Sequence, residues 1–140
     1  MSESSPTLPA DAGDQPYCWL TTTGRRSGRA RTVELWFALE GTTIYMLAGG
    51  RDSADWVRNV QVQPRVRLRL GSTDFEAIAR LDVEGSEAEP HVRRLLAAKY
   101  QGWQGGRPLT RWAREALPVA FDIVAPAAPD SAAGGIAGRG

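Results

Sequence analysis

Two-residue alternation of apolar and polar side chains runs through much of the central chain. In residues 65–70 arginines alternate with valine and leucines, the pattern of a strand with one wet face and one buried face. Residues 75–83 follow a Gly-Ser turn and are expected to form the partner strand. The pattern therefore predicts about six strands, the others lying over residues 17–22, 32–39, 43–48 and 119–124.

Helical spacing of apolar residues predicts two or three short helices between these strands. Ser53 can cap a helix of about two turns whose apolar side carries Trp56, and Pro64 stops it. A second helix opens at Ser86 with glutamates in its first turn and ends near Gly102, and residues 109–117 suit one more. Helices inserted among mostly antiparallel strands favour a small barrel or sandwich over a doubly wound sheet.

The chain length leaves room for one domain, which we place at residues 16–125. Residues 1–15 are rich in Ser, Pro, Asp and Ala, and residues 126–140 consist mostly of Ala, Gly, Pro and Ser. Such segments bury little apolar surface, so we expect a flexible tail at each end of the domain.

Charge and cysteine content exclude several classes of function. Seventeen Lys and Arg against sixteen Asp and Glu leave a net charge of +1, which argues against nucleic-acid binding. The single cysteine, Cys18, rules out an internal disulfide and a cysteine-built zinc site, and no metal site is expected. No apolar run approaches the ~20 residues of a membrane span, and the N-terminus lacks signal-peptide features. We therefore expect a cytoplasmic protein without stable membrane insertion.

The densest chemical signal is the segment LTTTGRRSGRAR at residues 20–31. Two glycines bracket a turn around which Arg25, Arg26, Arg29 and Arg31 crowd. Glycines let backbone N–H groups approach a ligand, and arginines add charge and forked hydrogen bonds, so the loop suits an anion. It lacks the pattern of a nucleotide P-loop. A solvated basic turn is the alternative interpretation.

A longer pattern carries a family resemblance. LTTTGRRSGRARTVELWF, followed by YMLAGGRDSADWVRNVQVQPRVRLRL, resembles the deazaflavin (F-420)-dependent nitroreductase or quinone reductase family, over roughly residues 17–124. The resemblance implies a mainly β (α+β) split β-barrel of about six mostly antiparallel strands. It further implies an oxidoreductase that passes hydride from reduced coenzyme F-420 to a small organic acceptor, either a quinone-like or a nitro compound.

The resemblance also assigns coenzyme-binding residues. Those matching the loop that grips the anionic coenzyme tail are Arg25, Arg26, Ser27, Gly28 and Arg31. Those matching the loop near the deazaflavin ring are Ala48, Gly49, Gly50 and Arg51. Trp56 and Asn59 match a supporting helix, although the residues themselves also suit a core position for Trp56 and a loop-fixing hydrogen bond for Asn59.

Tyr100 and Trp103 match catalytic positions where family members carry tyrosines that line the acceptor pocket and donate a proton. Trp103 departs from the family tyrosine and offers only a weak indole donor, which favours quinone-like acceptors over nitro compounds. The alternative for both residues is the apolar seam of the helix. An acid-base dyad is not required, because the deazaflavin supplies the hydride.

Other interpretations of the same residues stay open at this stage. A related split barrel can bind FMN or haem, although one FMN phosphate does not require four arginines in one loop. A carrier or sensor that binds F-420 or another anionic ligand without turnover is a further alternative to the oxidoreductase. A small-molecule electron acceptor is the expected partner, and the chain is expected to act as a monomer or homodimer.

Overall fold

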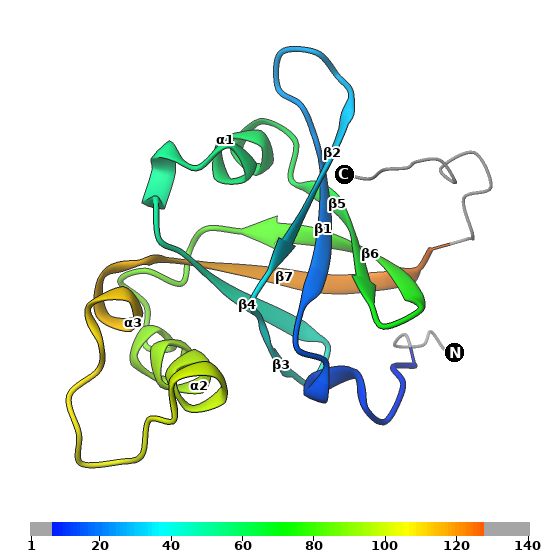
Figure 1. The fold of residues 1–140 in the computed structure, drawn as a ribbon. Helices are drawn as coiled ribbons and strands as arrows, with labels where there is room; N and C mark the ends of the chain where they lie inside the picture. The colour runs from blue at the N-terminus through cyan, green and yellow to red at the C-terminus, as the bar shows by residue number, and fades with distance from the viewer. Residues whose placement is uncertain (1–6, 128–140) are drawn as a thin grey trace.

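The computed structural model describes residues 7–127, which form one curled antiparallel sheet with three α-helices (Figure 1). The strands follow the order β2, β1, β5, β6, β7, β4, β3. Their bounds are β1 Cys18–Thr23, β2 Ala30–Leu35, β3 Ala38–Glu40, β4 Thr43–Ala48, β5 Arg65–Leu70, β6 Thr73–Arg80 and β7 Leu117–Pro126. The two edge strands, β2 and β3, are consecutive in the chain, so the curled sheet brings its two edges near each other, as expected for a split barrel.

The barrel interior holds the main hydrophobic core. The alternation of β5 and β6 turns Val66, Leu68 and Phe75 inward and leaves the arginines of β5 on the outer face. Met46 and Phe121 contribute from β4 and β7, and α1 (Asp55–Val62) covers one end with Trp56, Val57 and Val60. The predicted pairing of β5 with β6 is confirmed, with Leu68 opposite Phe75.

A second, smaller core lies outside the barrel. Helix α2 (Glu89–Gln101) buries Val92 and Leu96 against Leu47 and Ala120 of the sheet. Helix α2 ends where expected, because Gly102 takes a left-handed conformation with φ of 64°. Helix α3 (Arg111–Glu115) follows, and the short 3-10 helices η1 (Ala12–Asp14) and η2 (Arg51–Ser53) complete the elements.

The predicted single strand over residues 32–39 is wrong, and its division accounts for seven strands where about six are expected. The strand breaks between Leu35 and Ala38, and Phe37 and Ala38 are buried one after the other. The N–H of Phe37 donates to the Tyr100 hydroxyl instead of to a neighbouring strand, with an N to O distance of 3.0 Å. A side chain distant in the sequence therefore sets this bend, which alternation alone does not reveal.

The N-terminal segment also differs from expectation. Composition predicts a flexible tail over residues 1–15, but Ala12 is only 2% exposed within the main core and Leu8 packs against it. The packing begins before the expected domain boundary because these few apolar side chains cover one end of the barrel. Residues 1–6 and 128–140 lie outside the described residues, and the flexibility of both tails stays a prediction.

Cys18 of β1 is fully buried, and burial raises the pKa of its thiol to about 12. The folded chain binds the thiol proton more tightly than the unfolded chain. The contribution of Cys18 to the free energy of unfolding is therefore complete below pH ~9 and is lost as pH rises towards ~12. We expect the difference in unfolding free energy between the wild type and Cys18→Ala to narrow by about 2 kcal/mol between pH 8 and pH 10.5. Urea melts of both proteins at the two pH values measure this difference. If the difference in unfolding free energy is the same at both pH values, the raised pKa of Cys18 is contradicted.

Candidate functional site

The glycine-bracketed loop joins β1 to β2 and has a tight, internally bonded backbone. The N–H of Gly24 donates to the Arg29 carbonyl at 2.7 Å, and the N–H of Gly28 donates to the Gly24 carbonyl at 2.8 Å. Gly28 has a φ of 72°, and a Cβ on Gly24 would lie 2.8 Å from the Ser27 hydroxyl. The left-handed backbone at position 28 favours glycine, and a side chain at position 24 would crowd the loop, which presents its arginines from a defined backbone.

The arginines of this loop divide into two kinds. Arg26, Arg29 and Arg31 are exposed, and none of them forms an ion pair within residues 7–127. Arg25 is partly buried and donates through Nη2 to Asp55 at 3.2 Å. Three of the four guanidinium groups are therefore available to an anion from solvent, while Arg25 is bound to the protein.

Asn59 of α1 holds the loop in place. Its side chain is 3% exposed, and its Oδ1 accepts from the backbone N–H of Arg25 at 3.1 Å and from Arg25 Nη1 at 2.9 Å. Its Nδ2 donates to the buried Thr22 hydroxyl at 3.0 Å. The interpretation of Asn59 as a loop-fixing residue is therefore confirmed, and Figure 1 shows α1 lying next to the β1–β2 loop.

A second loop, Ala48 to Arg51, leads from β4 into α1. A Cβ on Gly49 would lie 3.4 Å from the Trp112 ring, so the indole of α3 packs close to this glycine. Arg51 adopts a φ of 51° and donates to the Glu115 carbonyl and to Glu84, both at 2.5 Å. The Arg51 guanidinium, predicted to bind the coenzyme, therefore ties this loop to α3 and to the segment before α2.

Trp56 lies in the core. Its side chain is 9% exposed, and its ring centroid lies 6.1 Å from that of Phe121. The core interpretation of Trp56 is therefore confirmed. Its predicted coenzyme contact stays a prediction.

The two predicted catalytic residues have polar atoms that are engaged with the main chain. The Tyr100 hydroxyl accepts from the Phe37 N–H and lies within donating distance of the carbonyls of Pro16, at 2.9 Å, and Phe37, at 3.1 Å. Desolvation by burial raises the pKa of Tyr100. Trp103 donates through Nε1 to the Arg107 carbonyl at 2.7 Å. Both groups thus have structural partners in this conformation.

Sequence reasoning missed an aromatic cluster beside the second loop. Trp36, at the bend after β2, is 40% exposed and stacks on the Tyr100 ring with centroids 4.4 Å apart and planes at 5°. The Trp36 ring also meets Trp112 edge-on, with centroids 5.4 Å apart, and the Trp112 ring lies close to Gly49. A large aromatic residue on the polar side of an alternating segment was the signal that could have located Trp36.

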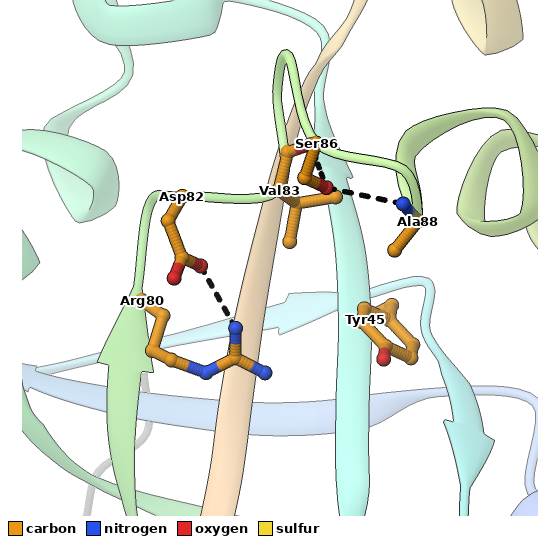
Figure 2. A pocket seen from close by; sticks show the side chains of 6 residues that line it. All are labelled: Tyr45, Arg80, Asp82, Val83, Ser86 and Ala88. Atoms are coloured by element: carbon orange, nitrogen blue, oxygen red, sulfur yellow. Dashed lines mark hydrogen bonds and ion pairs between the residues drawn. The ribbon is translucent and has the colours of Figure 1, made fainter.

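A separate small hollow of about 120 Å³ lies between β4, β6 and the start of α2 (Figure 2). Figure 2 shows Arg80 directed towards Asp82 there, and Arg80 also binds Asp122 at 2.6 Å. None of the predicted site residues lines this hollow. Since its arginine is already paired with two carboxylates, the hollow is a structural ion-pair site.

Within residues 7–127 no cluster of three or more His, Cys, Asp or Glu side chains is placed to hold a metal ion. None of the helices in this described part of the chain combines the length and the apolar character needed to cross a bilayer.

Comparison with known proteins gives one family and several structures of the same fold. The model of the F-420H(2)-dependent quinone reductase family matches residues 6–119. An F-420-H2 dependent reductase (FDR-A) is 27% identical, with a TM-score of 0.55 over 76% of this chain and 93% of that chain. A domain-swapped dimer is also 27% identical, with a TM-score of 0.55 over 76% and 79% of the two chains.

The haem storage protein HutZ from Vibrio cholerae shares the fold, with 16% identity and a TM-score of 0.60 over 84% of this chain and 86% of that chain. At this identity the likeness carries no information on the ligand. The predicted cytoplasmic location, the absence of nucleic-acid binding, and the monomer or homodimer state stay predictions.

Proposed function

Because this chain belongs to the F-420H(2)-dependent quinone reductase family and is thus an F-420-dependent oxidoreductase, we propose that it passes hydride from reduced F-420 to a quinone-like acceptor. The observation that carries the proposal is the set of three exposed arginines on the β1–β2 loop that form no ion pair within residues 7–127. Nitro compounds are the second acceptor class. They are the less favoured one, because Trp103 is a weaker hydrogen-bond donor than the tyrosine that family members carry at this position.

The charge chemistry of the loop fits the coenzyme. The tail of F-420 carries a phosphodiester followed by several glutamates, so it is a polyanion that several guanidinium groups can bind at once. Arg26, Arg29 and Arg31 would hold this tail, while Arg25 and Asn59 keep the loop backbone in position. FMN has a single phosphate and engages fewer of these groups.

The aromatic cluster provides a wall for an acceptor. The exposed Trp36 ring, supported by Tyr100 and bordered by Trp112, offers a flat apolar surface beside the Gly49 loop. When bound, the deazaflavin supplies the hydride, and the protein contributes binding, orientation and exclusion of water. We propose that the Ala48–Arg51 loop borders the coenzyme and that Trp36 contacts the acceptor.

Binding and turnover test this proposal. We expect fluorescence titration to show F-420 binding at least about tenfold tighter than FMN binding, because the longer polyanion engages more arginines. We further expect reduced F-420 to be oxidised by menadione only when the protein is present. Equal affinity for FMN would count against the coenzyme assignment. Tight F-420 binding without menadione reduction would support the carrier or sensor alternative.

A further inference from the structure

Two consecutive residues of α2 hold both main-chain groups of Phe37. Lys99 donates from Nζ to the Phe37 carbonyl at 3.0 Å, and the Tyr100 hydroxyl accepts the Phe37 N–H at 3.0 Å. The same hydroxyl lies 3.1 Å from the Phe37 carbonyl. The end of α2 therefore binds one peptide segment from both sides, at the point where the chain leaves β2 for β3.

Lys99 is the only lysine of the chain, and its ammonium group lies in a partly buried setting. The Nζ atom lies 3.6 Å from the centre of the Phe37 ring and 5.1 Å from that of Tyr100. Desolvation by burial lowers the pKa of Lys99, while the charge of Asp14 and the Cys18 thiol oppose this shift. Burying the ammonium group costs free energy that an apolar side chain at this position would not cost. The hydrogen bond to the Phe37 carbonyl and the contacts with the two aromatic rings offset this cost.

The bend that these contacts stabilise determines where the neighbouring side chain lies. Phe37 is completely buried, whereas Trp36 is exposed and stacked on the Tyr100 ring. Trp36 directly precedes Phe37, and its ring stacks on Tyr100, whose hydroxyl accepts the Phe37 N–H. Contacts that fix the Phe37 peptide therefore also fix the backbone that carries the Trp36 ring.

We propose that Lys99 is a positioning residue for the acceptor, which acts by holding the Phe37 carbonyl so that the Trp36 ring forms the acceptor wall. The inference rests on the proposed function, since it assigns Trp36 to acceptor binding. Lys99 itself does not contact the acceptor. Its effect therefore has to pass through Trp36, which makes it separable from a general effect on folding.

The first test compares Lys99→Met with the wild type. We expect the KM for menadione to rise about tenfold, because a misplaced contact group weakens acceptor binding, while the Kd for F-420 stays unchanged. Lys99→Arg retains a cationic donor and should restore most of the loss. The matched control is Arg94→Met, which removes from the same helix an exposed cation that has no ion pair within residues 7–127, and it should leave the KM unchanged. An unchanged KM in Lys99→Met, or no recovery in Lys99→Arg, would overturn the proposal.

The second test asks whether the effect passes through Trp36. In a Trp36→Ala background, Lys99→Met should raise the KM no further, since coupled residues give non-additive effects. Independent effects of the two substitutions would overturn the proposal. If thermal melts show that Lys99→Met is unfolded, Lys99→Gln takes its place in both tests.

A readout without coenzyme completes the design. The near-ultraviolet circular dichroism signal of Trp36 is the spectrum of the wild type minus that of Trp36→Phe. We expect this signal to be absent when the same subtraction is made between Lys99→Met and the double variant Lys99→Met, Trp36→Phe. Its persistence would show that Lys99 does not position Trp36. Failure of the proposed function would appear separately, as absence of F-420 binding or menadione reduction in the wild type.

Discussion

Arg31→Ala is expected to weaken F-420 binding about tenfold to a hundredfold, the usual cost of removing a charged hydrogen-bond partner from a bound anion. Arg31 lies opposite Thr22 at the start of β2, where a paired strand holds its backbone. Its side chain is exposed and free of ion pairs among residues 7–127, so folding does not depend on it. Fluorescence titration at one salt concentration measures the loss, after thermal melts confirm that the variant is folded.

Arg65→Ala is the matched control for Arg31→Ala. Arg65 is also an exposed strand arginine, but it binds Glu76 on the neighbouring strand and lies on the outer face of β5. We expect its removal to leave the Kd for F-420 nearly unchanged, because exposed ion pairs contribute little. Raising the ionic strength should weaken wild-type binding markedly. An equal loss in both variants would place the anion site on the outer face of the barrel instead of at the loop.

Asn59→Leu is expected to lower the free energy of unfolding by about 2–4 kcal/mol, since it leaves buried or partly buried polar groups without partners. The side chain of Asn59 bonds to the Arg25 N–H, to the Arg25 guanidinium and to the Thr22 hydroxyl. Leucine fills a similar volume and replaces none of these bonds. Urea melts measure the stability, and the Kd for F-420 should rise as well because the loop loses its anchor.

Two control variants show whether the effect of Asn59→Leu comes from its lost hydrogen bonds. Asn59→Asp retains the acceptor for Arg25, and the Thr22 hydroxyl can donate in place of the lost amide, so we expect a smaller loss of stability. Gln61→Leu removes an exposed amide from the same helix and should change stability by no more than about 0.5 kcal/mol. A small effect of Asn59→Leu, equal to that of Gln61→Leu, would show that α1 does not anchor the loop.

Local patterns were sufficient for much of the fold. The alternation in residues 65–70 predicts β5 with its bounds, because each side chain's face depends only on its place in the strand. Gly102 predicts the end of α2 for an equally local reason, since a left-handed residue is needed there. The loop of residues 24–29 was also recognisable, because its two glycines meet backbone requirements within the loop itself.

The sequence by itself thus determined most of the strands, the end of α2, the anion-suited loop and, through the family resemblance, the coenzyme class. Only the tertiary structure decided which arginines of the loop are available to bind an anion. Arg25 and Arg31 look alike in the sequence, but Arg25 is bound by Asn59, which lies 34 residues further on. Likewise the bend at Phe37 depends on Tyr100, 63 residues away. Alternation and propensity describe neighbours in the chain, whereas these roles depend on contacts that exist only after the barrel closes.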